Sequence, residues 1–222
     1  MQAEEKEKII IQKAALREIA KFVLTEKFKD KITKEKIEAE LVFKLSRHKK
    51  FQNSQIILYY KSLKDELDLS LLKENHPEKT WLVPVITKNK SLVFIEDNED
   101  NAELIKLTNR LKLSEEEELF KDALLEKVSD YMINELEMIL VPSLAFFKDK
   151  TRLGRGGGYY DRFFEKLYKI REKIYSASDI EKIREQEQFP EPYILGLGVK
   201  EMAIEKYPRE DFDQAVDEVI WF

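Results

Sequence analysis

Glycine is concentrated in one decapeptide of this chain, Arg152-Leu-Gly-Arg-Gly-Gly-Gly-Tyr-Tyr-Asp161. It holds four of the six glycines: Gly154, Gly156, Gly157 and Gly158. Glycine lets a backbone adopt positive φ and lets another group approach the main chain closely. Consecutive free N–H groups in such a loop can bind an anion, and arginine adds a planar set of donors that matches phosphate oxygens. The decapeptide favours a polyphosphate site, and a tight turn with incidental charges is the alternative.

The segments on either side give this loop a place in a fold. Met138-Ile-Leu-Val-Pro142 predicts a buried strand, and Tyr159–Leu167 has the spacing of a helix that begins directly after the glycines. This order would place the loop at the positive end of a helix dipole, at the carboxyl edge of a sheet, where ligands of open α/β sheets bind. The loop has neither the Gly-Lys-[Ser/Thr] of a Walker A motif nor the Gly-x-Gly-x-x-Gly of a dinucleotide fingerprint.

Predicted helices and strands alternate along the rest of the chain. We expect helices over 4–29, from an N-cap at Thr33, over about 65–75 and over roughly 115–134. We expect further strands over 54–60, 81–86, 91–95, 193–199 and 217–222. Segment 96–118 is ambiguous, and 168–190 is expected to be an exposed helical excursion. The alternation predicts one α/β domain over 1–222, a three-layer sandwich with a largely parallel sheet and helices on both faces.

Composition excludes several classes of function. The net charge of -5 among 222 residues argues against nucleic acid as the main partner. Cysteine is absent, which excludes disulfides, thiolate metal sites and a cysteine nucleophile. The first residues lack the order of a signal peptide, and no apolar run approaches the ~20 residues that span a membrane. We therefore expect a cytoplasmic monomer that acts on small molecules.

Cations and acids outside the decapeptide are weaker candidates. Lys13 and Arg17 lie four apart, on one face of the first predicted helix, and could reach phosphates; a solvated lysine-rich face is the alternative. Asp161 and Asp213 are candidate Mg²⁺ ligands, because this cation prefers oxygen and often bridges carboxylates to nucleotide phosphates. Asp213 lies in an acidic tail, so a solvated acid is the alternative there.

Glu66 follows a predicted strand and could therefore lie at the same functional edge, or it could stabilise a helix N-terminus by its charge. His48 and His76 show no metal-ligand spacing, and they leave no basis for a Ser/His/Asp arrangement.

Val141-Pro-Ser-Leu-Ala-Phe146 followed by the decapeptide and Arg162 resembles the signature of the 5-formyltetrahydrofolate cyclo-ligase family. Three weaker matches follow the same order along the chain: Lys13-Ala-Ala-Leu-Arg17, Tyr60 through Glu66, and Pro208-Arg-Glu-Asp-Phe-Asp213 with the strand after it. The resemblance implies an ATP- and Mg²⁺-dependent enzyme of one-carbon metabolism. Such an enzyme converts 5-formyltetrahydrofolate to 5,10-methenyltetrahydrofolate and releases ADP and phosphate.

The resemblance also implies roles for particular residues. Lys13 and Arg17 would hold ATP phosphates. Arg152 and Arg155 would be catalytic and would embrace the triphosphate with the loop. The remaining ATP-binding residues by resemblance are Gly154, Gly156, Gly157, Gly158, Tyr159 and Tyr160. The folate would contact Glu66, Arg155, Gly156, Gly157, Gly158 and Tyr159, and Asp161 and Asp213 would hold Mg²⁺.

This sequence departs from the family pattern at several positions. Ser143 replaces a usual glycine, Phe147 a usual aspartate and Val85 a usual basic residue; there is no glycine near Lys150, and 109–115 lacks a proline element. These changes touch the folate side more than the phosphate side. They leave two alternatives open: a relative that binds folate or nucleotide without turnover, or a different ATP-dependent ligase or kinase.

Overall fold

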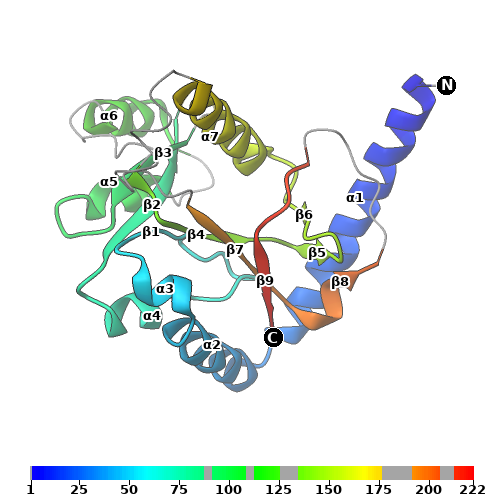
Figure 1. Ribbon diagram of the computed structural model, residues 1–222, viewed down its shortest axis with the longest axis horizontal. Coiled ribbons are helices and arrows are strands. Elements are labelled where there is room, and N and C mark those ends of the chain that lie inside the picture. Colours follow the sequence, from blue (N-terminus) through cyan, green and yellow to red (C-terminus); the bar gives the residue numbers. More distant parts are fainter. Residues whose placement is uncertain (1, 88–91, 109–112, 126–134, 177–191, 206–212) are drawn as a thin grey trace.

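A computed structural model describes residues 2–87, 92–108, 113–125, 135–176, 192–205 and 213–222 (Figure 1). Its centre is a six-stranded sheet in the order β3-β2-β1-β4-β7-β9. The strands are β1 Ile56–Leu58, β2 Thr80–Ile86, β3 Leu92–Glu96, β4 Met138–Pro142, β7 Tyr193–Gly198 and β9 Glu218–Trp221. All neighbours in this sheet pair in parallel except β2 and β3. The predicted α/β class with a largely parallel sheet is confirmed.

Helices cover both faces of this sheet. They are α1 Gln2–Lys27, α2 Lys31–Ser46, α3 Lys49–Asn53, α4 Ser70–Asn75, α5 Ala102–Thr108, α6 Glu115–Leu125 and α7 Tyr159–Ser176. Buried side chains of α1 to α5 form one core with alternate strand residues such as Ile57 and Leu140. Phe163, Phe164 and other apolar residues of α7 form a second core with the intervening residues of the same strands. This division follows from the alternation of side chains along each strand.

Pro84 lies inside β2, although proline cannot donate a ladder hydrogen bond. On one side it pairs with Phe94 of antiparallel β3. On the other side the strand pairing with β1 ends at Leu82, so the position needs no N–H donor there. The proline is thus accommodated within β2.

A second sheet of three short strands was not expected from the sequence. It consists of β5 Ala145–Phe147, β6 Arg152–Leu153 and β8 Ala203–Ile204, in the order β6-β5-β8. The first residues of the decapeptide are therefore in a strand, and the glycines follow that strand directly. Two or three residues are too few for a period-2 pattern to be recognised in a sequence.

Two predicted helix starts are wrong. The second helix is capped by Asp30, whose carboxylate accepts a hydrogen bond from the Thr33 N–H at 2.9 Å, so Thr33 lies inside the first turn. The helix expected over 65–75 begins only at Ser70, because Glu66 folds back onto the Leu63 N–H in the preceding loop at 2.9 Å. Residues 126–134, most of the 168–190 excursion beyond α7, and Pro208 lie outside the described residues.

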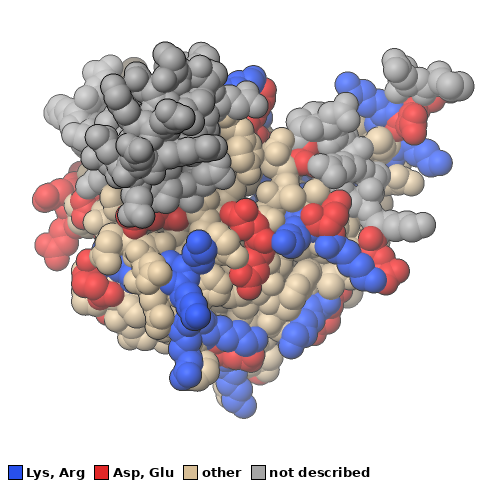
Figure 2. All heavy atoms as spheres, viewed as in Figure 1, with Lys and Arg blue, Asp and Glu red and all other residues tan. Residues whose placement is uncertain are grey.

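The surface carries charges of both signs. On the face shown in Figure 2, basic and acidic side chains lie next to one another on the described elements. Within the parts of the chain that the structure describes, no helix combines the length and apolar character needed to cross a membrane.

Candidate functional site

The glycine loop connects β6 to the N-terminus of α7. Gly156 and Gly158 have φ of 98° and 63°, in the region that L side chains rarely adopt. A Cβ at Gly157 would lie 2.5 Å from the ring of Tyr159. Three consecutive positions thus require glycine for conformation or space, and the loop brings its backbone to the positive end of a long helix. The predicted strand β4 and the predicted helix after the glycines are confirmed, but β5 and β6 of the second sheet lie between β4 and the loop.

Arg152 is buried beside this loop. Its side chain is 4% exposed and its Nη2 donates to Asp161 Oδ1 at 2.5 Å. The guanidinium lies over the rings of Tyr160 and Phe164, at 5.2 and 5.6 Å from their centroids. Arg152 Nε and the Tyr160 hydroxyl are buried and have no hydrogen-bond partner among the described residues. Burial raises the pKa of Tyr160 above its usual value, although Arg152 lowers it, so the phenol stays a proton donor.

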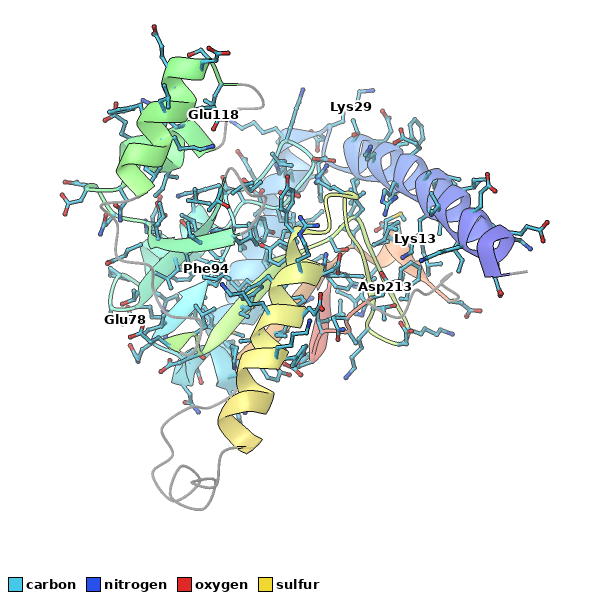
Figure 3. The ribbon with its side chains drawn as sticks, turned by 90° about the horizontal axis from the view of Figure 1, so that it is seen from above. Lys13, Lys29, Glu78, Phe94, Glu118 and Asp213 are labelled. Atoms are coloured by element: carbon cyan, nitrogen blue, oxygen red, sulfur yellow. The ribbon has the colours of Figure 1, made fainter. Side chains whose placement is uncertain are left out.

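Helix α1 brings two cations to the loop. Arg17 Nε donates to the Gly154 carbonyl at 2.9 Å, and its guanidinium lies against Gly156. Lys13, one turn earlier, donates to both carboxylate oxygens of Asp213 at 2.8 and 3.0 Å, and both residues are buried (Figure 3). The structure therefore brings Arg17 to the glycine loop, and it pairs Lys13 with an acid that the sequence assigned to metal.

Arg155 reaches away from the loop to the segment that follows β1. Its Nε donates to Glu66 Oε1 at 3.0 Å, and its Nη2 donates to Asp65 Oδ1 at 2.6 Å. Burial lowers the pKa of Arg155, but the hydrogen bond that Arg155 donates to Asp65 and the charges of both acids outweigh it and raise that pKa. Glu66 thus lies at the site, and it lies in a loop, not at a helix N-terminus. Sequence reasoning missed Asp65, although it stands next to Glu66.

Comparison with known proteins decides the family. The profile of the 5-formyltetrahydrofolate cyclo-ligase family matches residues 9–221. The chain belongs to this family. A 5-formyltetrahydrofolate cyclo-ligase of Mus musculus is 26% identical over 186 residues, which are 82% of this chain and 80% of that protein. A probable 5-formyltetrahydrofolate cyclo-ligase of Caenorhabditis elegans is 29% identical and covers 94% of this chain and 92% of its own length. Family membership makes the protein an enzyme of the ligase class.

Solved structures support the same fold at low sequence identity. A 5,10-methenyltetrahydrofolate synthetase from Mycoplasma pneumoniae superposes with a TM-score of 0.60 at 19% identity and covers 94% of this chain and 97% of its own. One from Aquifex aeolicus gives a TM-score of 0.59 at 18% identity, over 94% and 89% of the two chains. The overall fold of this chain is therefore shared with these two synthetases.

The departures from the family pattern have physical explanations. Val85 and Phe147 are at most 2% exposed and belong to the core that α1 to α5 cover. Each of these apolar side chains packs in the core at a position where the family pattern has a charged residue. The Ser143 hydroxyl donates to the carbonyls of Ala145 and Leu153 at 2.7 and 2.9 Å and fastens the start of the hairpin. Lys150 adopts a φ of 64°, near the position where the family pattern has a glycine and this chain has none. Residues 109–112 of the missing proline element lie outside the described residues.

The two predicted metal ligands of this cyclo-ligase each face a cation. Asp161 contacts Arg152 and Asp213 contacts Lys13. No cluster of three or more His, Cys, Asp or Glu side chains with metal-binding geometry occurs among the described residues. Two carboxylates nevertheless suit a hard cation that keeps water ligands and takes its remaining ligands from phosphate. Their role in metal binding stays a prediction.

Proposed function

We propose that this chain converts 5-formyltetrahydrofolate to 5,10-methenyltetrahydrofolate, consuming ATP and releasing ADP and phosphate. The observation that carries the proposal is the contact between Arg17 and the Gly154 carbonyl, 137 positions apart in the chain. It joins the N-terminal cations to the glycine loop, as a triphosphate site requires. Family membership supplies the reaction class, and the loop supplies donors for the phosphates.

In the proposed reaction, the formyl oxygen of the substrate attacks the γ-phosphorus of ATP, and ADP leaves. The phosphorylated formyl carbon is then attacked by N10, the ring closes, and phosphate departs with the former formyl oxygen. Phosphorylation converts a poor leaving oxygen into a good one. Positioning and charge neutralisation provide most of the catalysis of phosphoryl transfer.

The chain's own donors would do this positioning. Arg152 is the strongest candidate near the transferred phosphate, because its buried Nε has no partner among the described residues. A buried donor without a partner costs about 1–3 kcal/mol, which an anionic ligand would recover. Backbone N–H groups of the glycine loop and Arg17 would hold the remaining phosphates. Lys13 would join them by exchanging Asp213 for phosphate.

Mg²⁺, if bound, would be held by Asp161 and Asp213 and would neutralise charge on the phosphate oxygens. The donor chemistry of these two acids supports this assignment. Each acid is paired with one of the proposed phosphate-binding cations, so nucleotide would free the acids as it engages the cations.

Absorbance tests the proposal directly. Purified protein with 5-formyltetrahydrofolate, ATP and Mg²⁺ is expected to develop the near-ultraviolet band of the methenyl product, and omission of ATP is expected to abolish it. A folded protein that binds formyl-folate by calorimetry but gives no product would be a binding protein. Phosphate release that depends on another acceptor would instead indicate a different ligase or kinase. The burial of Val85 and Phe147 in the core favours the cyclo-ligase, since neither departure changes an exposed site group.

A further inference from the structure

The loop that follows β1 presents two neighbouring acids to one arginine. Arg155 is held between Asp65 and Glu66, on its Nη2 and its Nε respectively. The acid side chains are only 19% and 12% exposed, whereas that of Arg155 is 33% exposed. Two carboxylates around one guanidinium leave one negative charge in excess. The arrangement therefore contains one acid more than neutralisation of Arg155 requires.

The two acids are not equivalent in their other contacts. Glu66 Oε2 accepts a hydrogen bond from the Leu63 N–H at 2.9 Å, so the side chain is fixed at both oxygens. Its charge also acts on the buried phenols of Tyr60 and Tyr160, where it adds to the effect of burial and raises both pKa values. Glu66 thus contacts Arg155 and the Leu63 backbone, and its charge acts on both buried phenols. Asp65 holds the outer nitrogen of Arg155.

Other bonds hold this loop in place. The Tyr60 hydroxyl donates to the Leu67 carbonyl at 3.1 Å, and the Asp68 N–H donates to Glu38 Oε1 of α2 at 2.8 Å. The backbone directly after the two acids is therefore anchored independently of Arg155. Charged groups held on an anchored backbone keep their geometry when one partner changes.

We propose that Asp65 is a positioning residue: it keeps Arg155 neutralised and in place so that Glu66 can direct its carboxylate to N–H donors of the bound folate. The inference rests on the proposed function for the role of Glu66 toward that substrate. Without Asp65, one carboxylate must serve both Arg155 and the folate. The loss then falls on folate binding, and ATP binding is spared because Arg155 is still held by its Nε bond to Glu66.

The decisive variant is Asp65→Asn, which keeps the size of the side chain and removes its charge. We expect KM for 5-formyltetrahydrofolate to rise about tenfold, as is typical when a group that orients a ligand-binding residue is removed. KM for ATP and kcat are expected to change by less than about twofold. Asp65→Glu, which restores the charge, is expected to recover most of the folate affinity.

Asp68→Asn is the matched control, because Asp68 lies in the same loop and accepts from the Ser70 N–H. It makes the same change of charge three positions away, and its KM values are expected to stay at those of the wild type. Equal rises of KM for folate in both variants would overturn the proposal, since they would indicate a general effect of charge or loop stability. So would a rise of KM for ATP as large as that for folate.

A double-mutant cycle measured by calorimetric binding of formyl-folate isolates the coupling. In an Arg155→Met background Asp65 has nothing to position, so adding Asp65→Asn is expected to weaken binding by less than about twofold. A full tenfold loss in that background would overturn the proposal. A wild-type protein without affinity for formyl-folate would refute the proposed function itself, whereas normal wild-type binding with an unaffected Asp65→Asn variant would refute only the role of Asp65.

Discussion

Two clusters of charged side chains, one around Asp97 and one around the glycine loop, differ in how their hydrogen-bonding groups are satisfied. At the end of β3, the Asp97 carboxylate accepts from Lys61 and from Lys73, each at 2.6 Å, and from the Tyr59 hydroxyl. One buried acid thus collects three donors. In the glycine-loop cluster, Asp213 and Asp161 each face one cation, whereas Asp65 and Glu66 share Arg155. Two buried donors of this cluster remain without partners among the described residues, Arg152 Nε and the Tyr160 hydroxyl.

This difference separates a structural network from a ligand site. An open hollow of about 580 Å³ borders the Asp97 cluster, so the presence of a hollow does not make the distinction. Buried polar groups in native proteins are nearly always hydrogen-bonded, and the exceptions call for a ligand or another explanation. We therefore assign the Asp97 cluster to stability alone and the glycine-loop cluster to ligand binding, with its buried Lys13–Asp213 pair contributing to stability as well. The following variants test that assignment.

The largest effect is expected from Lys13→Ala in the glycine-loop cluster. Lys13 and Asp213 are 3% and 6% exposed, and removal of the ammonium takes this partner from a buried carboxylate. We expect the free energy of unfolding, measured in urea, to fall by about 3–5 kcal/mol. The double variant Lys13→Met with Asp213→Leu removes both charges and should recover most of the loss. A single variant within about 1 kcal/mol of the wild type would contradict a tightly coupled pair.

Arg155→Ala separates binding from stability within the same cluster. If Arg155 contacts the transferred phosphate, kcat/KM should fall, and the fall should correspond to a loss of more than about 2 kcal/mol of transition-state stabilisation. The unfolding free energy should change by less than about 1 kcal/mol, because the side chain is 33% exposed and its ion pairs are partly solvated. Lys148→Ala, at an exposed pair with Glu205, is the control for loss of a cation. Turnover like that of the wild type would refute the role of Arg155.

Asp97→Asn is expected to give the opposite pattern. It weakens the bonds from Lys61 and Lys73, and we expect a loss of about 1–3 kcal/mol in unfolding free energy. Activity per folded molecule should be unchanged. A fall in kcat/KM at full folding would show that the Asp97 cluster also serves the substrate and would remove the distinction between the two clusters.

The same variant has a pH signature. Burial raises the pKa of Asp97, but the hydrogen bonds from Lys61, Lys73 and Tyr59 outweigh it, and the pKa is lowered overall. A carboxyl whose pKa is lowered by folding contributes stability above its unfolded pKa, about 4, and that stability is lost as the pH falls through the folded pKa. Urea titrations should therefore show a steeper loss below about pH 4 in the wild type than in Asp97→Asn.

The sequence predicted those parts of the site whose residues lie close together along the chain. The glycines at positive φ, strand β4 and the helix after the glycines are encoded within one segment, so they could be interpreted without the fold. The short strands β5 and β6 between them could not. Arg17 was found through its spacing and the family resemblance. The partner of Lys13 could not be found in this way, because the pair joins residues 200 positions apart and depends on where the C-terminal segment crosses α1.

Asp65 escaped attention for a related reason. The expected helix over 65–75 made it an ordinary residue of a first turn, whereas the chain there is a loop whose direction is set by Arg155 and α2. The error at Thr33 is of another kind, since Asp30 and Thr33 are both good caps and local preference does not choose between them. Tertiary contacts decide such cases.

The smallest expected effect concerns the hairpin beneath the glycine loop. Lys150 is the one non-glycine residue at positive φ among those the structure describes. A left-handed conformation costs an L-residue about 1–2 kcal/mol, and glycine avoids this cost. Glycine also makes the unfolded chain more flexible, which lowers stability by about 0.5–1 kcal/mol. The Lys150 backbone bonds to Phe147 and Val216 at 2.9 and 3.0 Å persist in any variant, so the conformation should be kept.

We therefore expect Lys150→Gly to raise the unfolding free energy by about 0.5 kcal/mol, after loss of the Nζ contact with the Asp217 carbonyl. Lys148→Gly is the matched control in the same turn, at an ordinary φ, and it should lower stability because it relieves no strain. If both variants destabilise equally, the strain at Lys150 is absent. If Lys150→Gly is more stable and its kcat/KM is unchanged, the lysine introduces a small backbone strain into the hairpin. The activity of the phosphate site then does not depend on that strain.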